Sequence, residues 1–222
     1  FLKSNSVAAV VGAYGLRPNT GQTTNSIFAF NKKGQWENRR YDKTTLLAFG
    51  EYIPGARYVP QFKEWLPQVA DFARGSGPKT FSLSKTVLGP QICYEGLFAH
   101  FVRGLAIQGA EVIVNVTNDS WYGTWQEPYQ HLYMTLGRAI EVRRPLIRST
   151  NTGISTAILA NGEVLEKSPM DTEWTHLYQV PYKTNPPLTI FARWGYWLAP
   201  GFLALWAFFI LGHGFWLIRF KK

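Results

Sequence analysis

Cys93 is the only cysteine of the chain, and it stands where an apolar run ends and a helix-like stretch begins. A sulfur at such a strand-to-helix turn meets unpaired backbone N–H groups and the positive end of a helix dipole, which favour the thiolate. The thiolate is the form that attacks a carbonyl carbon. Most lone cysteines, however, are small buried hydrophobic residues. The position of Cys93 alone therefore leaves both interpretations open.

Further charged residues could take part in the same chemistry. Lys43 precedes a short apolar run and a Gly-Glu turn that contains Glu51. A lysine near a thiolate lowers the pKa of the sulfur, and it can hold the oxyanion of a tetrahedral intermediate. Taken alone, Lys43 is more typical of a surface lysine, Glu51 of a loop carboxylate, and Glu95 of a carboxylate at a helix start. None of these residues identifies a site by itself.

The elements that must position these residues alternate between strand and helix. Hydrophobic patterning predicts strands over residues 7–14, 26–30, 35–41, 80–84, 87–93, 111–116, 146–150, 154–159, 164–167 and 176–181. It predicts helices over residues 61–73, 97–108 and 128–141. Strands that alternate with helices indicate an α/β domain of packed layers.

The last part of the chain has the composition of a membrane helix. Residues 194–218 contain no formally charged side chain and are bounded by Arg193 and Arg219. At about 1.5 Å per residue this stretch can cross a bilayer core of roughly 30 Å. A buried core helix is the alternative, but a helix at the surface of a soluble protein has a polar face, and none is visible here. We expect a transmembrane helix over 194–218, a basic cytoplasmic tail over 219–222, and the remaining residues outside the cytoplasm.

The overall composition limits the classes of protein further. The chain has 222 residues, of which 46% are hydrophobic, enough for one domain with a core in addition to the membrane segment. The net charge is +9, but the basic residues are dispersed and no nucleic-acid recognition motif accompanies them. An anionic membrane surface explains the positive excess equally well. We therefore expect a membrane partner and no nucleic acid.

Five short blocks of the chain combine polar, aromatic and glycine residues around the candidate residues. In chain order, the blocks are Lys43 with Phe49-Gly50-Glu51-Tyr52-Ile53-Pro54, Ile92-Cys93-Tyr94-Glu95, Asn118-Asp119-Ser120-Trp121-Tyr122-Gly123, Gln130-His131 with Arg138-Ala139-Ile140-Glu141, and Arg148-Ser149-Thr150-Asn151-Thr152-Gly153-Ile154-Ser155. Together these blocks resemble the carbon-nitrogen hydrolase (nitrilase) superfamily and, within it, the apolipoprotein N-acyltransferases of the bacterial envelope. Any one block would be a weak signal, but all five occur in the right order. The resemblance implies an α-β-β-α sandwich of the nitrilase type and a Glu-Lys-Cys triad.

The resemblance also implies catalytic roles. Cys93 would be the nucleophile and would form an acyl thioester from a phospholipid. Lys43 would stabilise the oxyanion together with the backbone N–H of Tyr94. Glu51 and Glu95 match further carboxylates of an essential type in the family. No cofactor and no metal are expected.

Substrates, partners and location follow from the same resemblance. Trp121, Tyr122 and Tyr52 would contact substrate. The acyl group would pass from the phospholipid to the α-amine of a diacylglyceryl-cysteine at the N-terminus of an apolipoprotein. The enzyme would lie in the bacterial inner membrane with its catalytic domain on the periplasmic side.

One departure from the family pattern concerns the general base. The family's triad glutamate lies upstream of the strand that begins this chain, so residues 1–190 are expected to form a hydrolase domain that is incomplete at its N-terminus and inactive alone. Glu51 follows the lysine and does not match that position. An amidase that uses water as the acceptor is the alternative enzyme. A noncatalytic, membrane-anchored binding protein is the alternative if the base is truly absent.

Overall fold

The computed structural model describes the backbone of residues 1–121 and 123–220, and the side chains of these residues except 37 and 214–220. A three-stranded antiparallel sheet comes first, with β1 (Ala9–Leu16), β2 (Thr23–Phe30) and β3 (Trp36–Asp42) in that order. The turn between β2 and β3 forms because Asn31 accepts hydrogen bonds from the N–H groups of Lys33 and Gln35. Gly34 follows in the left-handed region, with φ of +73°. The strands expected over residues 26–30 and 35–41 are thus confirmed, and they pair as a hairpin.

A five-stranded sheet stacks against the first one and contains the strands that lead to the candidate site. Its order is β4 (Phe81–Leu83), β5 (Thr86–Ile92), β6 (Val112–Thr117), β7 (Leu146–Thr150) and β8 (Thr156–Ile158). The three central strands are parallel and the two outer ones are antiparallel to their neighbours. Because β5, β6 and β7 are parallel, their carboxyl ends lie at one edge of the sheet.

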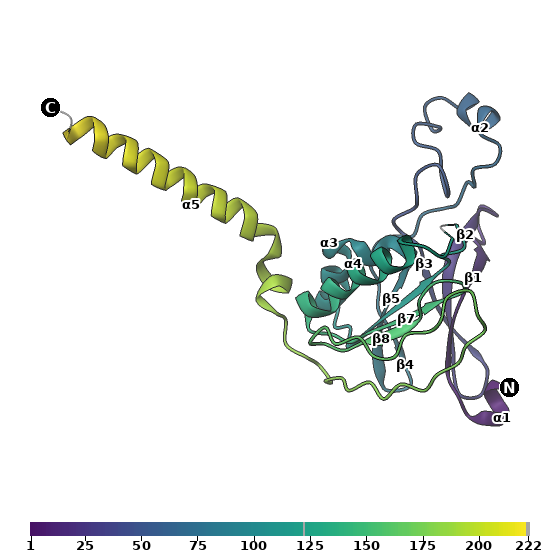
Figure 1. Cartoon of the computed structure of the whole chain (residues 1–222). Coiled ribbons are helices and arrows are strands. Elements are labelled where there is room, and N and C mark those ends of the chain that lie inside the picture. The colour runs from purple at the N-terminus through teal and green to yellow at the C-terminus, as the bar shows by residue number, and fades with distance from the viewer. Residues whose placement is uncertain (122, 221–222) are drawn as a thin grey trace.

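Helices cover the other face of the five-stranded sheet (Figure 1). Helices α3 (Ala99–Ile107) and α4 (Glu127–Val142) pack Leu105, Leu132 and Ala139 against the strands in the main hydrophobic core. A smaller core, which includes Ala29 and Val114, fills the space between the two sheets. The expected α/β sandwich is confirmed.

Three expected elements differ from the structure. The helix expected over 61–73 is only the short α2 (Gln61–Trp65), because Leu66 precedes Pro67 and takes a non-helical conformation. Residues 164–167 form a single bridge, Ile158 to Val164, instead of a strand. Residues 176–181 form no strand either. Within residues 174–178 every second residue is aromatic or His, and the rings of Trp174, His176 and Tyr178 contact one another instead of a neighbouring strand.

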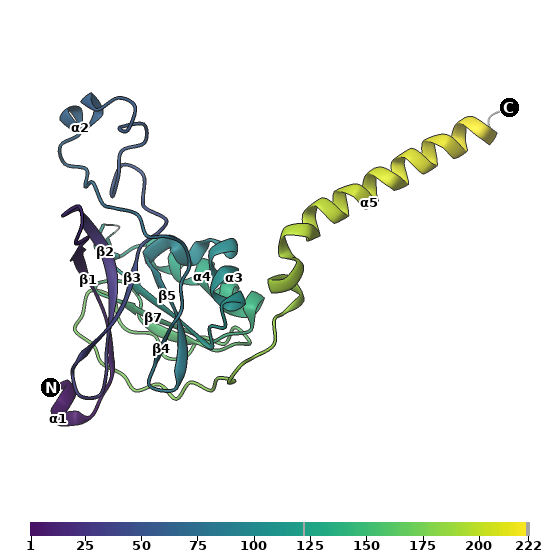
Figure 2. The same cartoon turned by 180° about the vertical axis from the view of Figure 1, so that it is seen from behind.

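The long helix α5 (Ile190–Phe220) extends away from the sheets, and it diverges from the segment that contains α2, which also rises above the sheets in both views (Figures 1 and 2). Its part from Ile190 to His213 is long and apolar enough to cross a membrane by length and composition, and it is not buried in the protein. Residues 214–218 of the expected membrane segment have no described side chains, and residues 221–222 of the expected tail lie outside the described residues.

Two arginines fix the connection between the sheets and α5. The Arg144 guanidinium is buried and donates hydrogen bonds to the carbonyl groups of Ala110 and Pro186. At the start of α5, Arg103 lies over the ring of Tyr196, 4.3 Å from its centroid. The helix is therefore attached to the domain through specific side-chain contacts.

Candidate functional site

Cys93 occupies a strained backbone position directly after β5. It is the first residue of η1 (Cys93–Leu97), a short 3-10 turn, and its φ is +54°. Residues other than glycine seldom adopt this left-handed conformation, and it persists only where the surroundings hold it. The amide of Asn115 on β6 donates a hydrogen bond to the Cys93 carbonyl at 3.0 Å. The helix expected from residue 97 begins only at Ala99, after the turn.

The environment of the sulfur has opposing effects on its acidity. Burial raises the pKa of the Cys93 thiol, while the charge of Lys43 and a hydrogen bond from the Tyr94 N–H lower it in part. The net result is a pKa above the ordinary value. Lys43 and the Tyr94 N–H thus favour the thiolate, as expected from the sequence, but the loss of water around the sulfur outweighs them in the resting site.

Lys43 is buried beside Cys93 and is not a surface lysine. Its ammonium lies 2.7 and 2.9 Å from the two carboxylate oxygens of Glu51. Glu51 also accepts hydrogen bonds from the backbone N–H of Leu47 and from the side chain of Asn25. The ammonium also lies 5.2 Å from the centroid of the Tyr94 ring. Glu51 therefore compensates the buried charge and fixes its position.

Glu95 connects the cysteine turn to the lysine loop. Its buried carboxylate accepts hydrogen bonds from the backbone N–H groups of Ile92, Thr44 and Thr45, and from the Tyr41 hydroxyl. Burial raises the pKa of Glu95. These bonds hold the segment that follows Lys43 against the end of β5, so the carboxylate acts through the backbone around it.

A cleft of about 920 Å³ opens above Cys93 and Lys43, between the two sheets and the loops at their ends. Trp121 lies on its wall with 76% of its surface exposed. Tyr52 and Tyr94 are not among the residues that line it. The Tyr52 ring lies under the Arg74 guanidinium, and the Tyr94 hydroxyl donates to a backbone carbonyl. Tyr122, the remaining expected substrate contact, lies outside the described residues.

Sequence reasoning missed a buried polar network under the cleft. The guanidinium of Arg148 on β7 donates hydrogen bonds to Asn115 at 2.9 Å and to Asp119 at 2.8 Å. Asp119 also lies 3.1 Å from Nδ1 of His131. Asp119, His131 and Arg148 belong to the sequence blocks that resemble the family, but the sequence indicated no role for them. Asn115 could have been noticed as an amide within an otherwise apolar strand pattern.

One corner of this network has the residue types of a metal site. Ligand atoms of Asp119, Glu127 and His131 lie within 4.8 Å of one another. However, the Arg148 guanidinium already forms an ion pair with Asp119, and neither side chain has any exposed surface. A cation would meet this fixed positive charge, so we assign no metal to these residues.

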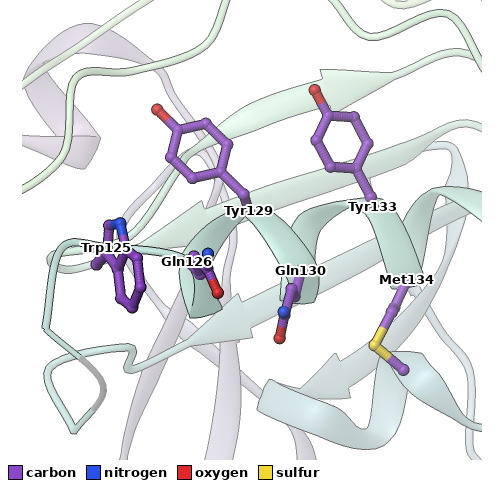
Figure 3. Close-up of a pocket in the computed structure, with 6 residues that line it drawn as sticks. All are labelled: Trp125, Gln126, Tyr129, Gln130, Tyr133 and Met134. Atoms are coloured by element: carbon purple, nitrogen blue, oxygen red, sulfur yellow. The ribbon is translucent and has the colours of Figure 1, made fainter.

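A second, shallower hollow follows the outer face of α4 (Figure 3). Six residues line it: Trp125, Gln126, Tyr129, Gln130, Tyr133 and Met134. The rings of Tyr129 and Tyr133 stand on one side of the helix and point away from it. The lining contains no charged side chain and none of the predicted catalytic residues.

Comparison with known proteins identifies the family. The carbon-nitrogen hydrolase family model matches residues 1–184. The chain belongs to this family. Two solved structures have a similar fold: a carbon-nitrogen hydrolase from Helicobacter pylori G27 and an amidase from Nesterenkonia sp.. Their TM-scores are 0.58 and 0.56, each at 20% identity, and they cover 78% and 77% of this chain and 61% and 60% of theirs.

Among carbon-nitrogen hydrolases, this chain is similar to apolipoprotein N-acyltransferases, as the sequence blocks indicated. It is 50% identical over 197 residues to the one from Bdellovibrio bacteriovorus, which covers 85% of this chain and 36% of that protein. It is 36% identical over 149 residues to the one from Geobacter metallireducens, covering 67% of this chain and 28% of that protein. The chain thus spans about a third of the length of these curated relatives.

Proposed function

We propose that this chain carries the acyl-transfer site of an apolipoprotein N-acyltransferase. It would move a fatty acyl group from a phospholipid, through a thioester on Cys93, to the α-amine of the N-terminal S-diacylglyceryl-cysteine of an apolipoprotein. The observation that carries this proposal is the cleft in which Cys93 lies beside a buried ammonium, that of Lys43, held by Glu51. The similarity to curated N-acyltransferases supports the choice of substrates.

In the first step, the Cys93 sulfur attacks the ester carbonyl carbon of the phospholipid. A C–S bond forms as the carbonyl electron pair moves onto oxygen, and the Lys43 ammonium and the Tyr94 N–H stabilise this oxyanion. The intermediate then collapses, the ester C–O bond breaks, and the lysophospholipid leaves after its alkoxide takes up a proton. The acyl group remains on Cys93 as a thioester.

In the second step, the α-amine of the apolipoprotein attacks the thioester carbonyl. A C–N bond forms through a second oxyanion at the same position, and the C–S bond then breaks to give the amide. The amine loses a proton and the sulfur regains one, so both steps need a proton carrier. Burial raises the pKa of the Cys93 thiol, which makes a general base necessary in the first step as well.

Glu51 does not fit the role of that base. Its carboxylate oxygens already accept hydrogen bonds from Lys43, Leu47 and Asn25. Its role in this proposal is to keep Lys43 charged and in place. Glu95 is likewise a positioning residue, because its contacts are with the backbone of the lysine loop and the end of β5.

The proposed setting is the bacterial inner membrane, with the cleft on the periplasmic side. Helix α5 would anchor the domain in the bilayer, and its basic end would lie in the cytoplasm. The exposed rings of Trp121 and Phe49 on the cleft wall suit contact with acyl chains.

The protein that the gene encodes should be purified in phospholipid-containing detergent and incubated with a peptide bearing an N-terminal S-diacylglyceryl-cysteine. Mass spectrometry should then show one further fatty acyl group on the peptide amine. Lys43→Arg should abolish transfer, because a planar guanidinium does not place charge as an ammonium does. The matched control, Lys63→Arg, changes an exposed lysine and should transfer normally. Release of free fatty acid with an unmodified peptide would contradict the proposal and indicate hydrolysis.

A further inference from the structure

We propose that Asn115, oriented by Arg148, is a positioning residue for the oxyanion site, because it sets the direction of the Tyr94 N–H. This inference rests on the proposed function, in which that N–H stabilises the oxyanion. It concerns two buried residues on β6 and β7 that do not touch the substrate in the proposed reaction.

Asn115 lies between the nucleophile turn and the Arg148 guanidinium. Its side chain is completely buried, its Nδ2 donates to the Cys93 carbonyl at 3.0 Å, and its Oδ1 accepts from Arg148 at 2.9 Å. The side-chain amide therefore forms a bridge from β7 to the backbone of the turn. The NH2 group of this amide meets an acceptor, the Cys93 carbonyl, and its oxygen meets a donor, the Arg148 guanidinium.

Arg148 determines which way round this amide lies. A guanidinium only donates hydrogen bonds, so the oxygen of Asn115 must face it, and the NH2 group must then face the Cys93 carbonyl. The guanidinium itself is fixed by Asp119 at 2.8 Å and by the Ile154 carbonyl at 3.2 Å. A flipped amide would place oxygen against oxygen and nitrogen against nitrogen in a site without water access, which is costly.

The orientation of the Cys93 carbonyl is transmitted through one peptide bond. That carbonyl and the Tyr94 N–H belong to the same planar trans unit, so they point in opposite directions. Holding the carbonyl toward Asn115 therefore turns the N–H to the other side, where it meets the Cys93 sulfur. The positive φ of Cys93 is unfavourable for a residue with a side chain, and the bond from Asn115 helps to hold it.

A matched control lies next to Asn115 on the neighbouring strand. Gln91 is the register partner of Asn115 between β5 and β6, and it is equally buried. Its amide atoms have no hydrogen-bond partner among the described residues. Replacing such an amide with an apolar side chain of similar size costs little. Gln91→Met therefore tests burial and size without changing the turn.

The test compares two reactions of Cys93 in the protein that the gene encodes. The first is formation of the acyl thioester from phospholipid, which needs an oxyanion site. The second is alkylation by iodoacetamide, which needs only an accessible thiolate. Asn115→Leu should slow thioester formation on the order of 10²-fold at unchanged phospholipid KM. At a pH above the pKa of the thiol, it should leave alkylation within about threefold of the wild type, because the sulfur is then ionised with or without the hydrogen bond from the Tyr94 N–H.

Two further variants keep the result interpretable. Asn115→Asp can still accept from Arg148 but places an oxygen against the Cys93 carbonyl, so it should lose acylation as Asn115→Leu does. Gln91→Met should acylate within about threefold of the wild type, since it leaves the turn intact.

Acylation of Asn115→Leu at the wild-type rate would overturn the inference. A parallel loss of acylation and of alkylation at this high pH would overturn it as well, because Asn115 would then control access to the sulfur and not the oxyanion site. If the wild-type protein forms no thioester, the proposed function fails and the inference fails with it, which is distinguishable from failure of the variants alone.

Discussion

The Lys43 ammonium lies 2.7 Å from the Glu51 carboxylate, and only 2% of the lysine side chain is exposed. A buried ion pair of this kind depends on both partners, because removing one leaves the other charged in a poorly hydrated place. The seven residues between the two, 44–50, form the loop around the cleft floor, and backbone N–H groups of this loop bond to Glu51 and Glu95. The position of the ammonium is therefore a property of the whole loop.

Glu51→Gln tests this pair. It should lower the free energy of unfolding by about 3 kcal/mol, since the Lys43 ammonium loses its countercharge. Asp71→Asn is the control, because it breaks an ion pair with Lys63 in which both side chains are more than half exposed, and it should cost less than about 1 kcal/mol. Denaturant titration of both variants measures the difference. Equal losses would show that the Lys43–Glu51 pair contributes no more than a surface pair.

Lys43→Met should move the pH dependence of Cys93 alkylation to higher pH. The Lys43 charge lowers the pKa of the thiol, so its removal leaves burial even less opposed and raises that pKa further. At any pH below the thiol pKa the variant should react more slowly with iodoacetamide than the wild type, and the two rates should converge at high pH. Lys63→Met should react as the wild type does. An unshifted profile in Lys43→Met would contradict the contact between these charges.

Asp119→Asn should destabilise the protein by about 3–5 kcal/mol at neutral pH, because Arg148 would lose its buried countercharge. Burial acts to raise the pKa of Asp119, but the hydrogen bond with His131 and the charge of Arg148 outweigh it and keep that pKa below its ordinary value.

The sign of the pH dependence follows from this lowered pKa. The stabilisation is present above the pKa of an unfolded aspartate, about 3.9, and is lost as the pH falls through the lower value of the folded state. The gap in unfolding free energy between wild type and Asp119→Asn should therefore shrink below about pH 4. A gap that stays constant with pH would show that the carboxylate is not ionised in the folded protein.

Trp121→Ala should weaken the use of phospholipid without unfolding the domain. The ring lines the cleft and is 76% exposed, so its removal should change stability by less than about 0.5 kcal/mol. The phospholipid KM should rise about threefold to tenfold, which corresponds to roughly 0.7–1.4 kcal/mol of lost apolar contact. Trp125→Ala, an equally exposed tryptophan that does not line the cleft, is the control. A large drop in thermal midpoint with an unchanged KM would make Trp121 a structural residue.

The fold and the position of Cys93 in it could be predicted from the sequence because both depend on local patterns. Apolar runs and turn residues mark β5, β6 and β7, and short blocks mark Lys43 and Cys93. Two expected elements were wrong for reasons outside the local pattern. Pro67 ends the helix expected over 61–73, and residues 176–181 have no neighbouring strand in the described part of the chain with which to pair.

The raised pKa of Cys93 and the contacts of Asn115 could not be read from the sequence. The first depends on how much water the folded chain excludes from the sulfur, which no local pattern records. The second depends on the register of three strands, which places an amide of β6 between the turn after β5 and an arginine of β7. Both are consequences of tertiary packing.

Intact-mass analysis of the protein after brief exposure to phospholipid tests the central claim most directly. The account predicts one added fatty acyl group that maps to the peptide containing Cys93, that neutral hydroxylamine removes, and that Cys93→Ala lacks. An acyl group bound elsewhere, no adduct during turnover, or full acyl transfer by Cys93→Ala would contradict the account.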